Sequence, residues 1–151
     1  MFPRRALASR WLIRPDALNT FGAALEITEA AAMGYFDSAD VLNELCGRTG
    51  AQIVVDDLGA GYSNLKRIID LKPSFVKLDR ELTRGLDVAP RQRILVANVV
   101  RLCVDLGARV VAEGIETRDE LAAVIDCGVH YGQGYLLARP AYPPPMVSWP
   151  T

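Results

Sequence analysis

The sequence is poor in the residues that bind zinc or form disulfide bonds. Its 151 residues include one histidine and three cysteines, against 18 aspartate and glutamate residues. Cys46, Cys103 and Cys127 are odd in number, widely spaced and free of any CxxC pattern, which gives no support to a disulfide framework. We expect buried thiols in a reducing cytoplasm. A bound metal would be held mainly by carboxylate oxygens, which argues against zinc.

The chain also lacks an excess of charge and a long apolar run. The 17 basic and 18 acidic residues leave a net charge of -1, which supports neither a nucleic-acid surface nor an anionic membrane partner. The longest apolar stretch, 94–106, is interrupted by Asn98, Arg101 and Asp105 and is shorter than the ~18 residues of a membrane span. The N-terminal residues are arginine-rich but lack the sustained apolar core of a targeting peptide. We therefore predict a cytoplasmic protein with a small-molecule partner.

Short β-branched runs alternate with longer amphipathic stretches, which is the pattern of βα units. The expected strands are 24–29, 52–57, 75–79, 109–114 and, more weakly, 130–138. Strands joined by helical crossovers form a parallel sheet that needs cover on both faces. A doubly wound sheet and part of a (β/α)8 barrel both satisfy this requirement. With 151 residues, 50% of them hydrophobic, the chain is long enough for one core.

Helix signals lie between the expected strands. The expected helices are 39–50 after Asp37 or Ser38, 64–71 after Ser63, 91–107 after Pro90, and 118–128 after Thr117. Gly47 and Gly50 offer stop signals for the first of these helices. Glu120 stands at the capping-box position of the last.

Polar residues gather at the carboxyl ends of the expected strands. The stretch 54–65, VVDDLGAGYSNL, ends an apolar run on two adjacent carboxylates and places two glycines before the next helix. Turn chemistry accounts for one aspartate, whereas two like charges side by side need a cation between them, a metal or a lysine. Carboxylates, a lysine and an amide end the other strands, and in a barrel these ends share one catalytic face. This distribution favours the barrel.

Five motifs resemble, in order, those of the EAL domain, the bacterial phosphodiesterase that linearises cyclic di-GMP. They are LEITE, DDLGAGYSNL, FVKLDR, VVAEGIET and YGQGYLLARP, and the similarity runs from about Leu25 to Pro140. The resemblance implies an α/β fold of the modified (β/α)8 TIM-barrel type, with two divalent cations, Mg²⁺ or Mn²⁺, at its carboxyl-terminal face. It also implies hydrolysis of cyclic di-GMP to the linear dinucleotide pGpG in second-messenger signalling.

The resemblance also implies roles for individual residues. Glu26 would ligate one metal ion, Asp56 would bridge both and Asp57 would ligate the second. Lys77 and Glu113 would position and activate the attacking water. Phosphodiester hydrolysis needs a nucleophile and neutralisation of the phosphate oxygens, which two hard cations with oxygen ligands supply. A lysine beside metal ions can have a lowered pKa and serve as a base or an orienting donor.

Further residues at the same strand ends are implied as supports. Asp79 would contact the substrate or the metal shell, and Gln133 would support the metal-bound water. Glu29 resembles the family's glutamate that tethers the loop after the paired aspartates, and Glu116 shares the motif of Glu113. Taken singly, such residues also have structural explanations, as surface charges, helix-dipole partners or donors to backbone groups.

The sequence departs from the family pattern at its front. It contains no Glu-Ala-Leu motif and no counterpart of the family's metal-binding asparagine. A barrel of this kind takes about 250 residues, so we expect a truncated EAL domain at 20–140, between a divergent segment 1–19 and a Pro-rich tail 141–151. An unclosed sheet exposes edges and apolar surface, which predicts a homo-oligomer or a separate covering chain. The alternatives to an impaired phosphodiesterase are an inactive nucleotide-binding or protein-interaction module and a relic that folds poorly and has no function.

Overall fold

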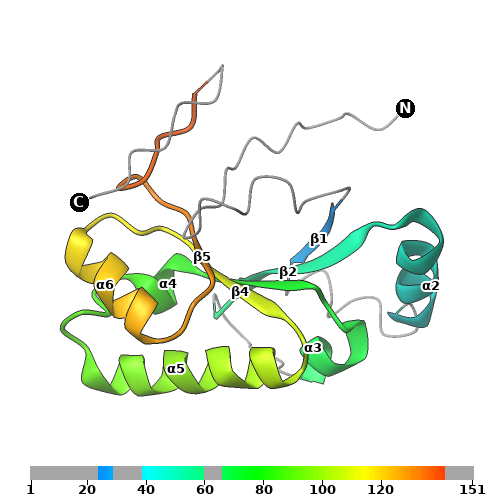
Figure 1. The fold of residues 1–151 in the computed structure, drawn as a ribbon, viewed down its shortest axis with the longest axis horizontal. Helices are drawn as coiled ribbons and strands as arrows, with labels where there is room; N and C mark the ends of the chain where they lie inside the picture. The colour runs from blue at the N-terminus through cyan, green and yellow to red at the C-terminus, as the bar shows by residue number, and fades with distance from the viewer. Residues whose placement is uncertain (1–23, 29–38, 60–65, 142–151) are drawn as a thin grey trace.

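The computed structural model describes residues 24–28, 39–59 and 66–141, which form a five-stranded parallel sheet (Figure 1). The strands follow one another across the sheet in chain order: β1 (Ala24–Thr28), β2 (Gln52–Leu58), β3 (Phe75–Leu78), β4 (Arg109–Ala112) and β5 (Tyr131–Gly132). Each neighbouring pair is parallel. All the predicted strands are present. The last is shorter than predicted because the chain turns at Gly134, whose carbonyl accepts hydrogen bonds from the N–H groups of Leu137 and Ala138.

The predicted helices are present, with one addition. They are α2 (Ala39–Thr49), α3 (Lys66–Leu71), α5 (Pro90–Asp105) and α6 (Arg118–Asp126), and the addition is the short helix α4 (Arg80–Thr83). Pro90 begins α5, and Thr117 caps α6 through a capping box with Glu120. Gly47 lies inside α2, so it is not a stop signal, whereas Gly50 follows the helix with φ 71°. Outside the described residues lie the predicted caps Asp37, Ser38 and Ser63.

The two faces of the sheet carry different layers. On one face, strand residues such as Ile53, Val76 and Val110 share a single buried core with the helices. The helix residues of that core include Cys46 of α2, Ile68 of α3, Val96 of α5 and Val124 of α6. The opposite face carries a separate buried cluster of Val54, Phe75, Val111 and Tyr131. The described helices therefore pack on one face of the sheet.

Strand order and helix placement decide between the two expected architectures. In a doubly wound sheet the strand order reverses at a switch point and helices cover both faces. Here the order is sequential and the helices share one core on one face. This arrangement is the wall of a (β/α)8 barrel, in which the second face points to the barrel interior. The described residues thus form part of a barrel, as the sequence predicted.

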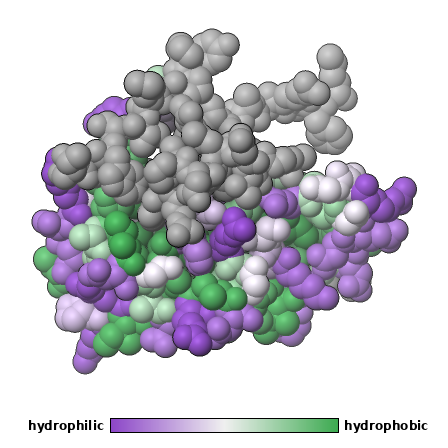
Figure 2. Space-filling view, viewed as in Figure 1, coloured by the Kyte–Doolittle hydropathy of each residue, from purple (hydrophilic) through white to green (hydrophobic). Residues whose placement is uncertain are grey.

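The outer surface is mixed in polarity. Figure 2 shows hydrophobic residues among hydrophilic ones on the side below the sheet, and Ile94, Leu95 and Val104 of α5 are exposed. None of the described helices combines the length and the apolar character that a membrane crossing requires. Self-association and the proposed domain limits stay predictions, since segment 1–19 and residues 142–151 lie outside the described residues.

The cysteines are free thiols in the interior, as predicted. Cys46, Cys103 and Cys127 are all buried and unpaired with one another. Burial raises the pKa of the Cys103 thiol to about 11, and burial also raises the pKa of Cys127. Because the thiolate is the reactive form, Cys103 and Cys127 have a structural role in the core.

Candidate functional site

The adjacent carboxylates of Asp56 and Asp57 lie at an irregularity of β2. Successive residues of a regular strand point to opposite faces, which would separate the two side chains. The pairing of β2 with β3 shifts between Val55 and Leu58, and Asp57 has φ 60°, a left-handed conformation that is uncommon for a residue other than glycine. Carboxylate oxygens of Asp56 and Asp57 consequently come within 4.8 Å of each other and of Glu113. The irregular strand end gathers two neighbouring carboxylates at one place.

Lys77 of β3 lies among the carboxylates of three other strands. Its Nζ is 2.8 Å from Asp56 Oδ1 on β2 and 2.6 Å from Glu113 Oε1 at the end of β4. The same Nζ is 3.9 Å from Glu26 Oε1 on β1. The lysine side chain is only 9% exposed. The prediction that these strand-end residues converge on one face is confirmed for these side chains.

An apolar layer lies beneath the charged one. On four neighbouring strands, a buried apolar residue precedes a polar strand-end residue by two positions: Val54 before Asp56, Phe75 before Lys77, Val111 before Glu113, and Tyr131 before Gln133. Residues two apart on a strand share a face, and barrel interiors are filled by such layers. The polar residues therefore form the layer at the carboxyl end of the barrel interior, next to a buried apolar layer.

The electrostatics of the site favour bound cations. Burial raises the pKa of Glu113, and the negative charges of Asp56 and Asp57 add to this effect, although Lys77 opposes it. Burial and the charges of Asp56 and Asp79 likewise raise the pKa of Asp57. The single ammonium group of Lys77 thus neutralises the surrounding carboxylates only in part. Ionisation of Asp57 and Glu113 is therefore unfavourable until a cation binds beside them.

The carboxylates around Lys77 favour its charged form. Burial by itself would lower its pKa, but the hydrogen bonds and charges of Asp56 and Glu113 outweigh burial and raise it. These contacts raise the pKa, whereas the lowered pKa expected of a lysine beside metal ions concerns the metal-bound site and stays a prediction. Lys77 is a charged hydrogen-bond donor.

The donor set fits a hard divalent cation. Asp56, Asp57 and Glu113 each offer a carboxylate oxygen to one small region, and Mg²⁺, Mn²⁺ and Ca²⁺ prefer oxygen ligands. Glu113, which the sequence argument placed on the attacking water, is therefore also in position to ligate a metal. Glu26 is outside this group of three among the described residues and is linked to it through Lys77.

The predicted support residues occupy different surroundings. Asp79 caps α4, because its Oδ1 accepts a 2.7 Å hydrogen bond from the N–H of Glu81. Glu116 is paired with Arg80 at 2.8 Å, away from the carboxylate group. Glu29 lies outside the described residues.

Gln133 ends β5 in a tightly packed segment. Its Oε1 is buried without a hydrogen-bond partner in the described part of the chain, so an acceptor is available at this strand end. Its backbone is held by hydrogen bonds with Ala112 and Ile115. A Cβ on the next residue, Gly134, would lie 2.0 Å from the carbonyl oxygen of Ile115, so only glycine allows this close approach.

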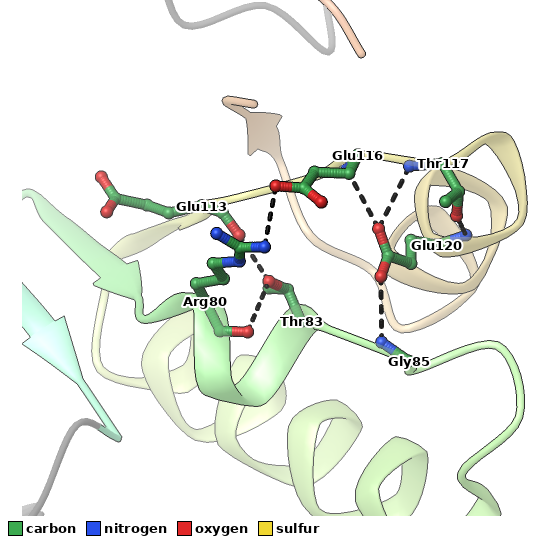
Figure 3. A network of polar contacts seen from close by, with 7 residues as sticks. All are labelled: Arg80, Thr83, Gly85, Glu113, Glu116, Thr117 and Glu120. Atoms are coloured by element: carbon green, nitrogen blue, oxygen red, sulfur yellow. Dashed lines mark hydrogen bonds and ion pairs between the residues drawn. The ribbon is translucent and has the colours of Figure 1, made fainter. Parts of the chain in front are cut away.

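A polar network behind the site was not foreseen from the sequence (Figure 3). It joins α4, the loop after β4 and the first turn of α6 through Arg80, Thr83, Gly85, Glu113, Glu116, Thr117 and Glu120. Glu120 accepts hydrogen bonds from the N–H groups of Gly85, Glu116 and Thr117. The capping-box role of Glu120 was predicted, whereas no feature of the sequence indicated its contact with Gly85.

Comparison with protein families gives one assignment for nearly the whole chain. Residues 7–140 match the EAL domain family. Among curated proteins, the cyclic di-GMP phosphodiesterase PA2567 of Pseudomonas aeruginosa is 38% identical over 125 residues, which cover 83% of this chain. That alignment covers 21% of the relative, so the chain spans about a fifth of its length.

Solved structures agree with the family match. The chain is similar to BlrP1 of Klebsiella pneumoniae, solved as a manganese and cyclic di-GMP complex, with a TM-score of 0.73 and 36% identity. This match covers 78% of the present chain and 30% of that one. The EAL domain of DcpA from Mycobacterium smegmatis matches with a TM-score of 0.70 and 32% identity, over 78% of this chain and 52% of that one.

Proposed function

The chain belongs to the EAL domain family, and from that premise we propose that it supplies part of the active site of a metal-dependent cyclic di-GMP phosphodiesterase. The product would be the linear dinucleotide pGpG. The observation that carries the proposal is the gathering of Glu26, Asp56, Asp57 and Glu113 around Lys77. Relatives named as cyclic di-GMP phosphodiesterases and a structure with cyclic di-GMP bound support the choice of substrate.

The residues of the site divide into metal ligands and positioning groups. Asp56 and Asp57, with Glu26 and Glu113 beside them, would hold Mg²⁺ or Mn²⁺. Bound divalent cations lower the pKa of water and neutralise the charge that develops on phosphate oxygens. Asp56 would serve both cations, as the family resemblance implies; its carboxylate lies within reach of the oxygens of Asp57 and Glu113 and shares Lys77 with Glu26.

Lys77 and Glu113 would act on the attacking water. The Lys77 ammonium is a fixed donor on a buried stem, so it can orient a water or a phosphate oxygen without giving up its proton. The Glu113 carboxylate, whose pKa burial raises, can accept a hydrogen bond from that water. Because the two groups are in direct contact at 2.6 Å, a water bound to one of them would lie beside the other, as oriented attack requires.

The remaining predicted residues would act at the rim. The second oxygen of Asp79 is available to the metal shell or the substrate while the first caps α4. The Oε1 of Gln133, which has no hydrogen-bond partner among the described residues, can accept a hydrogen bond from a metal-bound water. We assign Glu29 and Glu116 to the support of loops, in the case of Glu116 through its pair with Arg80.

The proposal can be tested in a chimaera, since the chain spans only part of the length of its relatives. Residues 24–140 would replace the matching segment of the DcpA EAL domain, and conversion of cyclic di-GMP to pGpG would be measured with Mn²⁺ and with Mg²⁺. We expect turnover that Asp56→Asn abolishes, because the substitution removes the charge shared by the metal sites. Asp105→Asn, which neutralises an exposed carboxylate of α5, is the matched control and should leave turnover unchanged.

Two results would overturn the proposal. Turnover by the Asp56→Asn chimaera at the unmodified rate would show that the carboxylate group does not hold the catalytic metals. A folded chimaera that binds Mn²⁺ and cyclic di-GMP without hydrolysis would favour the alternative of an inactive nucleotide-binding module.

A further inference from the structure

Thr83 is a buried hydroxyl directly behind the candidate site. Its residue exposure is 1%, and it ends the short helix α4. Its Oγ1 donates to the backbone carbonyl oxygen of Glu113, thirty positions away in the sequence, and also lies 3.2 Å from the carbonyl oxygen of Arg80. Figure 3 shows the Glu113 side chain pointing away from Thr83 while the backbone carbonyl meets it.

All the polar groups of Glu113 are thus bound by one stretch of chain, 77–83. The carboxylate contacts Lys77 Nζ, the N–H donates to the carbonyl of Leu78 at 3.1 Å, and the carbonyl accepts from Thr83. The backbone contact with Leu78 follows from the pairing of β3 with β4. The Thr83 contact is made by a side chain outside the sheet, so it can be removed without altering the strands or either side chain of the Lys77–Glu113 pair.

The residue after Glu113 makes this third contact important. Gly114 has φ 70°, and glycine adopts positive and negative φ with similar ease. The peptide between Glu113 and Gly114 therefore has little intrinsic preference for one orientation. A hydrogen bond to its carbonyl oxygen fixes that orientation, and with it the direction in which the Glu113 side chain leaves the backbone.

Helix α4, which carries Thr83, is held by hydrogen bonds on several sides. Asp79 caps the start of α4, and Gln92 Nε2 of α5 donates to the carbonyl of Leu82 at 2.8 Å. At the far end of the loop, Glu120 links the N–H of Gly85 to the N–H of Glu116. The loop after β4 is consequently fastened at both ends to the segment that begins with α4.

We infer that the Thr83 hydroxyl is a positioning residue for Glu113. By holding the Glu113–Gly114 peptide, it keeps the Glu113 carboxylate beside Lys77 and within reach of Asp56 and Asp57. The expected effect on metal binding rests on the proposed function, whereas the positioning of Glu113 rests on the hydrogen bonds alone. Partners that orient a metal ligand typically change metal affinity by about ten- to a hundred-fold when they are removed.

The test compares two substitutions in the full chain. Thr83→Val keeps the shape and removes the hydroxyl, whereas Thr83→Ser keeps the hydroxyl and removes the methyl group. Val100→Ala, which shortens a buried side chain of α5 outside the network, controls for general loss of stability. The measurements are Mn²⁺ affinity, by electron paramagnetic resonance of free Mn²⁺, and the ¹³C resonance of the Glu113 carboxyl carbon without metal, assigned through Glu113→Gln.

We expect Thr83→Val to weaken Mn²⁺ binding by about ten-fold and to shift the Glu113 resonance. Thr83→Ser and Val100→Ala should stay within about two-fold of the unmodified chain, with the resonance in place. If Thr83→Val does not fold, Thr83→Ala removes the same hydroxyl and should show the same changes.

Two outcomes would overturn the inference. One is a hydroxyl-free variant with unmodified Mn²⁺ affinity and an unmoved Glu113 resonance. The other is a loss in Thr83→Ser as large as that in Thr83→Val, which would assign the effect to packing. If the unmodified chain binds no Mn²⁺, the resonance alone decides: a shift confined to the hydroxyl-free variants supports positioning, while the proposed metal site fails separately.

Discussion

Replacing Lys77 by methionine removes the cation at the centre of the carboxylate group and keeps a side chain of similar length. The Nζ lies 2.8 Å from Asp56 and 2.6 Å from Glu113. Removing one member of a buried ion pair typically costs about 3–5 kcal/mol, because the partner stays buried without compensation. The Asp56 and Glu113 side chains keep 16% and 20% exposure, so water offsets part of this cost. We expect a loss of about 3 kcal/mol, which lowers the Tm by about 10 °C in a chain of this size.

Thermal unfolding with and without Mn²⁺ measures both consequences of the change. In the absence of metal, Lys77→Met should unfold well below the unmodified chain. Divalent cations replace the missing positive charge, so Mn²⁺ should raise the Tm of the variant more than that of the unmodified chain. A ligand at a hundred times its Kd adds about 2.7 kcal/mol, enough to recover most of the loss.

Arg101→Met is the control for losing a cation from the surface. Arg101 pairs with Asp105 on α5 in an exposed contact, and such pairs contribute less than about 1 kcal/mol. The reasoning is refuted if Lys77→Met is no less stable than Arg101→Met. It is refuted equally if Mn²⁺ leaves the Tm of the Lys77 variant unchanged while it stabilises the unmodified chain.

Three further predictions address neighbouring groups. Asp57→Gly should raise stability by about 1 kcal/mol in denaturant unfolding, because it relieves a left-handed conformation and a crowded carboxylate, but it should weaken Mn²⁺ binding; a clear loss of stability would contradict this. Burial by itself would raise the pKa of Glu120, yet hydrogen bonds from three backbone N–H groups lower it. The ionised Glu120 side chain therefore stabilises the fold above its pKa in the unfolded chain, about 4.3, and this stabilisation is lost as the pH falls through the lower pKa of the folded chain. The stability difference between the unmodified chain and Glu120→Gln should therefore shrink on acidification below about pH 4, and a difference that grows would reverse the assignment. Cys103, with its pKa raised to about 11, should resist thiol reagents until the chain is unfolded; rapid labelling of the native chain would show that it is accessible.

The strands and most of the site could be predicted because the signals are local. An apolar run that ends in a carboxylate or a lysine marks both a strand and its carboxyl end, and parallel pairing then brings such ends together. Pro90 and the Thr117 capping box are local signals as well, and they mark the starts of α5 and α6. The helix α4 was missed because it has only 4 residues, too few for a helical period, although Asp79 ahead of it is a recognisable cap.

The contacts that complete the site depend on residues far apart in the sequence. Alternation along β2 predicts opposite faces for Asp56 and Asp57, and only the shift in pairing with β3 brings them together. The hydrogen bond from Thr83 to Glu113 joins a helix end to the carbonyl of another strand end. Such contacts follow from the packing of α4 against the loop after β4, which no short motif reports.

Backbone strain and excess negative charge meet at Asp57, beside the partly buried acid Glu113. Asp57 combines a left-handed backbone with a carboxyl whose pKa burial and neighbouring charges raise, and Glu113 is an acid held among acids. A sequence optimised for stability alone would place glycine at the first position and an apolar residue at the second. Instead, the rest of the fold holds the Glu113 carboxylate in place, through Lys77 of β3, Thr83 of α4 and the Glu120 network. An incoming cation relieves the excess negative charge at these positions, so substitutions that remove the charge to gain stability should weaken the site.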